Sequence, residues 1–349
     1  MYDVRCGCWT RYSMKSFAKE FNNVCCETNK GKLIGTRNDK DHEKGGTEDC
    51  LVFQSSNHFN VIPYNTASYN KTFMKFVYKM KHSDIKNVIE SRFEKIEDSW
   101  DKIIKHFDME EIHDFRVEVK KLRAFMRLAA TALASPVELK IPFHLKSLYR
   151  SAGNIRTLQL QQQRIFQHVT EKKFREPTQY LQILLDQQRY WERKIPEISN
   201  RKALETEEEM LILTFNSKLG KESVKKYTET RTRELRDLLT VREHSDERLH
   251  QIRKILKDIM YTLPYTGDYF FSFFNNRLQS KEDLKSLTDI LGEIQDASTS
   301  LQFLLPEYIK EVTDPEEISS IQTIREEWTL QKADKKNVVC ENLAQIGME

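Results

Sequence analysis

The chain has 349 residues, of which 31% are charged and 39% apolar, a balance typical of a globular protein. Its formal net charge of +3 gives no global attraction to nucleic acid or membranes, so a preference for anions must come from local clustering of cations. Because the sequence has no apolar run of about 18 residues and no apolar N-terminal segment, we expect neither a transmembrane helix nor a secretory signal. By default we expect a cytoplasmic protein without a membrane partner.

The first part of the chain lacks the periodicity of helices or strands. Residues 1 to about 73 are polar and irregular, and apolar side chains recur at helical spacing only after Met74. We predict an irregular N-terminal extension over residues 1–80, with Met74 or Met80 as the natural start. Five of the six cysteines lie in this extension: Cys6, Cys8, Cys25, Cys26 and Cys50. Their spacing fits no standard zinc finger, so ordinary thiols are favoured over a zinc or disulfide site.

The rest of the chain, residues 81–349, has the apolar spacing of amphipathic helices. Several of these segments end at prolines, because proline cannot continue a helix. The pattern predicts helices over residues 82–106, 109–134, 141–168, 176–194, 202–239, 243–263, 279–305 and 315–346. No segment alternates as a strand would. Long helices with short connections predict an all-α domain of antiparallel bundles.

Two sequence patterns occur twice in the helical region. IHDFRVEVKKLRAF (112–125) matches LHQIRKILKDIMYT (249–262), with an arginine three positions and a lysine seven positions after the histidine in both. Further on, LKSLYRSAGNI (145–155) matches LKSLTDILGEI (284–294), glycine to glycine. The offsets of 137 and 139 residues predict two copies of one helical unit. We expect a pseudo-two-fold pair in which the two histidine-bearing helices can meet.

One helix of the first copy sorts its cations onto one side. At about 100° per residue, five side chains fall within roughly 80° of arc: His113, Arg116, Lys120, Arg123 and Arg127. Like charges at this spacing repel by about 0.2–0.5 kcal/mol per pair, and an anionic ligand would relieve that repulsion. For this stripe taken alone, an ordinary solvated helix face is an equally good interpretation.

The second copy repeats the stripe with His250, Arg253 and Lys257, and Lys254 and Tyr261 lie on its flank. Two such stripes would line a groove that suits a long, repetitively charged anion, because arginine binds phosphate oxygens bidentately. The stripes contain no stacking aromatic and no asparagine or glutamine for reading bases, which disfavours nucleic acid. Within the two stripes no carboxylate or cysteine accompanies the histidine, which disfavours a metal site. We therefore predict a phosphate chain without bases as the ligand, and no cofactor.

These motifs resemble the CHAD family, the conserved histidine α-helical domain. IHDFRVEVKKLRAFMRL is similar to the family's H-x-x-R-x-x-x-K-x-x-R signature, and LHQIRKILKDIMYTL to its second copy, within a likeness over about residues 84–345. The resemblance implies two antiparallel four-helix bundles related by pseudo-two-fold symmetry, with a first repeat at about 84–200 and a second at about 201–345. It also implies that inorganic polyphosphate binds along a basic central surface, and in some members it implies an association with storage granules. The binding residues that it implies are His113, Arg116, Lys120, Arg123, Arg127, Lys146, Arg150, Arg156, His250, Arg253, Lys254, Lys257 and Lys285.

The sequence also departs from the family pattern. Asp258 and Met260 stand where the family is commonly basic, and Thr157 replaces the usual acid, so we expect affinity to be skewed to the N-terminal half. We expect no catalytic residues and no enzyme activity, because hydrolysis of phosphoanhydrides generally needs a metal held by carboxylates. Two alternatives stay open: a helical scaffold for protein partners or nucleic acid, and an accessory to a phosphoanhydride-processing enzyme.

Overall fold

The computed structural model describes residues 79–133, 140–241, 244–274 and 278–346. These residues form ten α-helices and one 3-10 helix, and no strand, so the all-α prediction is confirmed for the described part of the chain. The elements are α3 (His82–His106), α4 (Met109–Ala130), α5 (Phe143–Lys172), α6 (Thr178–Ile198), α7 (Arg201–Thr214), α8 (Lys221–Leu239), α9 (Asp246–Thr266), η1 (Gly267–Phe273), α10 (Lys281–Gln302), α11 (Pro306–Ile309) and α12 (Pro315–Ala344). None of these helices carries an apolar stretch sufficient to cross a bilayer.

The folded part begins slightly earlier than the sequence suggests. The predicted extension lies outside the described residues except for Lys79 and Met80. Met80 forms an isolated antiparallel bridge with Leu219, in which each backbone N–H donates to the other residue's carbonyl oxygen at 3.0 and 3.1 Å. Its side chain is buried in the first hydrophobic core, so Met80 belongs to the fold rather than to an extension.

The single helix predicted over residues 202–239 is wrong, because two helices, α7 and α8, occupy this segment. Phe215 ends α7 with a buried side chain, and Leu219 uses its backbone to pair with Met80 instead of continuing a helix. Gly220 then caps α8 in an extended conformation. The break thus depends on a contact with a residue far away in the sequence.

Two helices run past their predicted ends at prolines, α6 by four residues and α9 by three. Pro196 lies inside α6 and Pro264 inside α9. Both prolines stand near the C-terminal end of their helix, where the helix ends within a few residues, at Ile198 and at Thr266. A proline at this position removes one backbone hydrogen-bond donor, but few helical residues follow it, so little of the helix is disturbed. After α9, Gly267 adopts a φ of 63°, which suits glycine, and the chain enters η1.

Local capping sets where the two helices with cation stripes begin. The Asp108 carboxylate accepts hydrogen bonds from the backbone N–H groups of Glu110 and Glu111 at the start of α4. The Ser245 hydroxyl does the same for Arg248 at the start of α9. Caps of this kind stabilise a helix by about 1 kcal/mol and fix its first turn. The two caps therefore set where α4 and α9, the helices that carry the cation stripes, begin.

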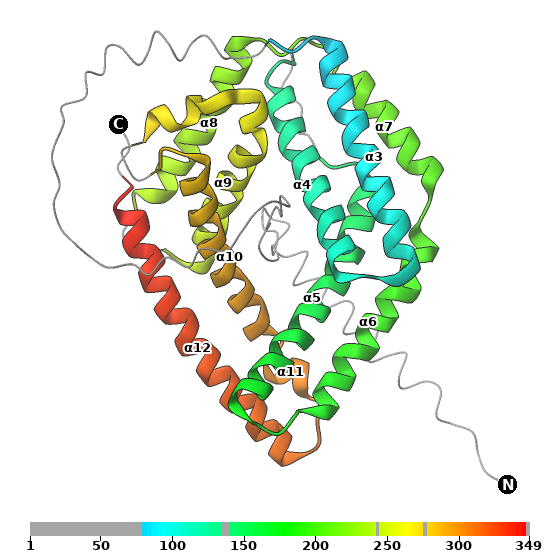
Figure 1. Ribbon diagram of the computed structural model, residues 1–349, viewed down its shortest axis with the longest axis vertical. Helices are drawn as coiled ribbons and strands as arrows, with labels where there is room; N and C mark the ends of the chain where they lie inside the picture. Colours follow the sequence, from blue (N-terminus) through cyan, green and yellow to red (C-terminus); the bar gives the residue numbers. More distant parts are fainter. Residues whose placement is uncertain (1–78, 134–139, 242–243, 275–277, 347–349) are drawn as a thin grey trace, which may run out of the picture.

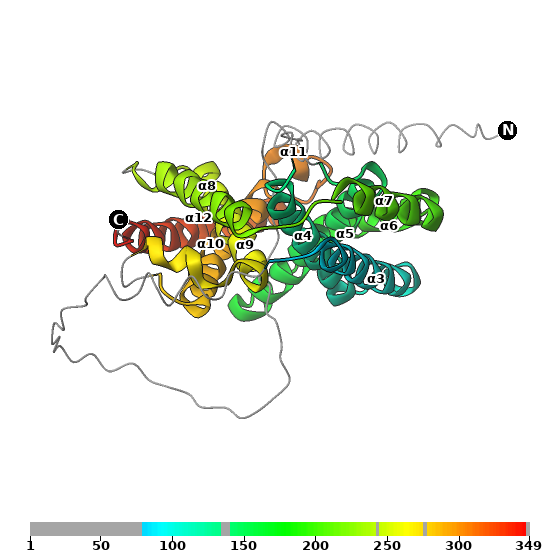
Figure 2. The ribbon, with the colours of Figure 1, turned by 90° about the horizontal axis from the view of Figure 1, so that it is seen from above.

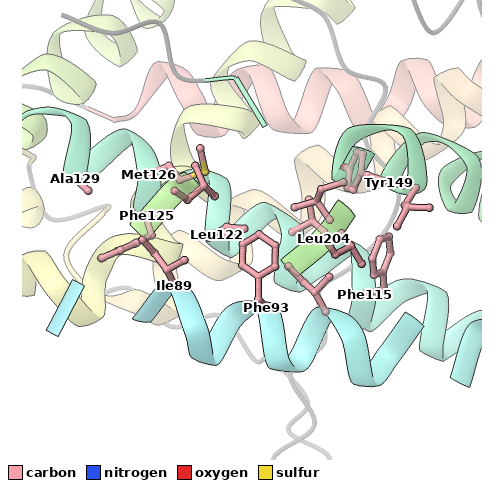
Figure 3. Close-up of a cluster of buried hydrophobic side chains, with 14 of the residues drawn as sticks. Ile89, Phe93, Phe115, Leu122, Phe125, Met126, Ala129, Tyr149 and Leu204 are labelled. Carbon is pink, nitrogen blue, oxygen red and sulfur yellow. The ribbon is translucent and has the colours of Figure 1, made fainter. Parts of the chain in front are cut away.

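The first hydrophobic core lies mainly between α3, α4, α5 and α7. Figure 3 shows Ile89 and Phe93 of α3 pointing towards Phe125 and Leu122 of α4. Leu204 of α7 is buried in the same core, so the helix after residue 200 packs with the first half of the chain. Val224 and Tyr227 at the start of α8 also belong to this core, whereas Leu235 of the same helix belongs to the second core, so the change of core falls within α8.

Two further cores complete the molecule. One joins α8, α9, η1 and α10 with the C-terminal end of α12. The other joins the far half of α5, α6, the end of α10, α11 and the first half of α12. Figure 1 shows the resulting shape, two lobes side by side that converge on a common tip where the ends of α5 and α6 meet α11 and the start of α12.

Helices α4 and α9 pack against each other where the two lobes meet. Both views place them side by side in the middle of the molecule (Figures 1 and 2). Ala124 of α4 is fully buried and belongs to the core of the second lobe. The two histidine-bearing helices thus do meet, as the sequence repeat predicts, and their contact forms a seam between the lobes.

Candidate functional site

Four cationic side chains and one histidine from three helices gather at this seam. Arg123 and Arg127 come from α4, Arg231 from α8, and His250 and Lys254 from α9; together we call them the basic cluster. Their proximity is visible in the pKa of Lys254, which is lowered first by burial and then by Arg123 and Arg127, with a smaller effect of Arg231. Positive charge therefore accumulates in this part of the seam at the cost of local repulsion.

His250 is neutral in the basic cluster. Its side chain is 7% exposed, and burial, followed by Lys254, Arg253 and Arg123, lowers its pKa to about 3. A buried imidazole between cations does not take up a proton, since both desolvation and like charge oppose the charged form. The histidine of the second stripe thus lines the seam as an uncharged ring.

One carboxylate enters the cluster. The Arg127 guanidinium donates a hydrogen bond to the Asp258 carboxylate, and Asp258 is buried. The pKa of Arg127 is nevertheless lowered, chiefly by burial, because the favourable effect of Asp258 is opposed by Arg123 and Arg231. One acid therefore does not balance the surrounding cations. In the sequence, Asp258 interrupts the cations of the second stripe. In the structure, it forms an ion pair with Arg127 of the first stripe.

Two predicted binding residues, Arg116 and Arg253, lie in the interior, each beside a glycine. Arg116 donates from Nη1 to the carbonyl oxygen of Tyr149 at 2.7 Å, and its guanidinium carbon lies 4.2 Å from the centre of the Tyr149 ring. A Cβ on Gly153 would lie only 2.1 Å from Arg116 Nη1. Arg253 occupies the corresponding place beside Gly292, where a Cβ would lie 3.2 Å from its Nε and Nη2. The matching glycines of the repeat therefore make room for guanidinium groups.

Other predicted residues are also buried and paired within the protein. Arg156 donates from Nη1 to the carbonyl oxygen of Met109 at 2.8 Å, which ties α5 to the start of α4. Lys257 is 5% exposed, and its Nζ lies 3.8 Å from the Asp289 carboxylate. Lys120 is buried as well. These cations are built into the packing of the lobes, which the sequence pattern does not reveal.

The remaining predicted residues lie half-buried on α4, α5 and α10: His113, Lys146, Arg150 and Lys285. Among the thirteen predicted positions, the structure brings together Arg123, Arg127, His250 and Lys254 in one cluster.

Sequence reasoning missed Arg231. It stands on α8, outside both copies of the repeated motif, in a segment predicted as part of one long helix. Its guanidinium carbon lies 5.6 Å from the centre of the Tyr227 ring, one turn earlier on the same helix. The spacing of four residues between Tyr227 and Arg231 could have indicated that the two side chains share one face of a helix. Only the fold shows that this face of α8 points at the seam.

The charged side chains of the seam are suited to an anion rather than to a metal ion. In the described part of the chain, no group of three histidine, cysteine or carboxylate side chains could hold a metal ion. The Nε atoms of Arg123 and Arg231 are buried and have no acceptor among the described residues. Buried donors without acceptors are costly, and a ligand with many oxygen atoms would satisfy them.

The described residues thus form an all-α protein of two lobes (Figure 1). Residues 87–305 match the CHAD domain family, so the chain belongs to that family. The crystal structure of the CHAD domain from the plant Ricinus communis is similar at a TM-score of 0.58 and 14% identity, covering 78% of this chain and 95% of that one. PptA from Streptomyces chartreusis is similar at a TM-score of 0.58 and 8% identity, covering 76% and 99%. At these identities the two structures show the fold alone. No curated protein sequence matches the chain.

Proposed function

We propose that this protein binds inorganic polyphosphate, without catalysis, through the basic cluster at the seam between its lobes. One observation carries the proposal: cations from three different helices converge there around the acid Asp258, and burial together with the repulsion from Arg123 and Arg127 lowers the pKa of Lys254. Such an arrangement costs stability in the unliganded protein and is relieved by a multiply charged anion. The chain belongs to the CHAD family, and the family resemblance of its motifs implies polyphosphate binding, which supports the same proposal.

A phosphate chain fits the cluster better than nucleic acid does. Arginine forks bind phosphate oxygens in pairs, and Lys254 adds a mobile point charge. The aromatic side chain next to the cluster, Tyr227, is buried and is not placed to stack on a base. Duplex DNA is the second candidate ligand, since its backbone carries the same phosphate charge.

The proposal includes no enzyme activity. Phosphoanhydride hydrolysis generally uses a metal ion held by carboxylates. In the basic cluster the one carboxylate, Asp258, is already paired with Arg127. Incubation of the protein with polyphosphate and Mg²⁺ should therefore release no phosphate above background; steady release that scales with protein concentration would contradict the proposal.

The test is a binding titration with fluorescently labelled long-chain polyphosphate. The double variant Arg123→Gln with Lys254→Gln should bind at least about tenfold more weakly, since each charged contact is worth about 1.5–3 kcal/mol. The matched control, Lys202→Gln with Lys226→Gln, removes two charges from exposed positions on α7 and α8 and should bind like the wild type. Equal losses in both variants would show binding by general charge and would contradict the assigned site.

Competition separates the two candidate ligands. Unlabelled polyphosphate should displace labelled duplex DNA at lower phosphate concentration than DNA displaces polyphosphate. The affinity should also fall steeply as salt is raised, because binding releases counterions. If DNA is the stronger competitor, nucleic acid becomes the preferred ligand of the seam.

A further inference from the structure

Asp258 occupies an unusual position for an acid. It stands on α9 in the stripe that otherwise carries His250, Arg253 and Lys257, and it is 5% exposed. It forms an ion pair with Arg127 of α4, and Arg127 and Lys254 both feel the charges of Asp258 and of Arg231 from α8. The carboxylate thus lies where three helices direct positive charge.

The contacts of Asp258 are those that a phosphate group would make. Its Oδ2 accepts from Nη1 of Arg127, and its charge raises the pKa of Lys254 against the effects of burial, Arg123 and Arg127. Carboxylate and phosphate oxygens accept hydrogen bonds from the same guanidinium donors with similar geometry. Nearby, the buried Nε atoms of Arg123 and Arg231 have no acceptor among the described residues. The carboxylate therefore satisfies only part of this donor set.

We propose that Arg127, Arg231 and Lys254 form one phosphate subsite of the seam, and that Asp258 is an internal competitor which occupies it in the unliganded protein. A phosphate group of the ligand replaces the carboxylate on Arg127 and also reaches donors that the carboxylate leaves unpaired. Asp258 thereby lowers the affinity for polyanions and stabilises the cluster in their absence. This subsite assignment rests on the proposed function of the seam.

The exchange has a thermodynamic signature. In the wild type, the phosphate that displaces Asp258 from Arg127 releases one counterion of the polyanion, but the freed carboxylate takes up a cation again, so this contact adds little to the salt dependence of binding. Removing the acid frees one full cation for the ligand. The slope of log affinity against log salt should then become steeper by about one, the change expected when one more ion is released on binding.

The experiment compares Asp258→Asn with Asp237→Asn, which makes the same change of net charge at an exposed position on α8. Asp258→Asn should bind long-chain polyphosphate about tenfold more tightly, corresponding to about 1.4 kcal/mol for release of the competing ion pair. Its salt slope should be steeper by about one. Asp237→Asn should change affinity less than about twofold and leave the slope unchanged. Equal behaviour of the two variants would overturn the subsite.

A second variant keeps the test independent of folding. In an Arg127→Gln background the gain from Asp258→Asn should vanish, because the pair no longer exists. Asp258→Asn alone should lower the melting temperature of the unliganded protein, since cations lose their counter-charge, and polyphosphate should raise it by more than in the wild type. A gain that persists without Arg127 would contradict the exchange.

The two proposals fail in distinguishable ways. If the wild type shows no salt-dependent binding of polyphosphate, the proposed function fails. If the wild type binds and Asp258→Asn alters neither affinity nor salt slope, the function stands and only the competitor is refuted.

Discussion

The two halves of the protein use the same arginine and glycine pairing with different results. Arg116 and Arg253 are each 5% exposed and each lie against a glycine of the following motif. Arg116 is fixed by the carbonyl oxygen and the ring of Tyr149, and only its Nε has no acceptor among the described residues. For Arg253, both Nε and Nη2 have none.

The difference shows that sequence repeats preserve position more strictly than they preserve interactions. The first half uses its buried arginine as a structural cross-link between α4 and α5. The second half keeps an equivalent guanidinium beside His250 with less of its hydrogen-bonding capacity satisfied. Truncating the two arginines should therefore have unequal effects, which the first prediction tests.

Arg116→Ala should destabilise the protein by about 3 kcal/mol, because it removes a buried charge-assisted hydrogen bond and a cation–π contact. Arg253→Ala should cost about 1 kcal/mol, since the loss of packing is offset by removal of a charge with unpaired donors. Urea denaturation of both variants measures the difference. Equal losses would mean that Arg253 is as well satisfied as Arg116.

Gly153→Ala should destabilise by about 2 kcal/mol, since overpacking a buried site typically costs 1–3 kcal/mol. The new methyl carbon would lie 2.1 Å from Nη1 of Arg116 and would push the guanidinium off Tyr149. A stability close to that of the wild type would show that Arg116 can move without losing its contacts. Far-ultraviolet circular dichroism should show unchanged helicity, so that the loss reports on packing.

Stability should fall as the pH is lowered through the range below 6.5, because His250 is held neutral. Its pKa is lowered to about 3 in the folded protein, so below its unfolded pKa only the unfolded chain takes up the proton. From pH 7.5 to pH 6 the loss due to this one group should be up to about 1 kcal/mol. His250→Gln should have a shallower pH profile than the wild type in urea denaturation. Parallel profiles would contradict the neutral, buried histidine.

Gly292→Ala should have the smallest effect, within about 0.5 kcal/mol of the wild type. Its Cβ would lie 3.2 Å from two nitrogen atoms of Arg253, which can yield by a few tenths of an ångström. Alanine is also a better helix former than glycine by roughly 0.5–1 kcal/mol, which offsets the crowding. A loss as large as that of Gly153→Ala would erase the proposed difference between the two halves.

Much of the fold follows from the sequence because helical periodicity is a local signal. The bounds of α3 agree with the predicted span, and the start of α4 at Met109 is fixed by the cap at Asp108. The break between α7 and α8 could not be predicted, since Leu219 leaves the helical pattern to pair with Met80. The presence of a helix thus follows from a short segment of sequence, whereas the end of α7 depends on Met80, which is far away in the sequence.

The candidate site divides in the same way. A wheel places Arg116 and Arg123 on one stripe, and nothing local distinguishes them. The packing of α5 buries Arg116 against Tyr149, while α8 and α9 surround Arg123 with other cations. Arg231 was not predicted, because its role depends on the face that α8 turns towards the seam.

The sequence by itself determined the helices, the repeated stripes and the family, because each is written in residue types at fixed spacing along one helix. The tertiary structure alone decided which cations are cross-links and which form the basic cluster, and it paired Asp258 with Arg127 from the other half. Burial and the approach of charges from separate helices control those roles, and both arise only when distant segments pack together.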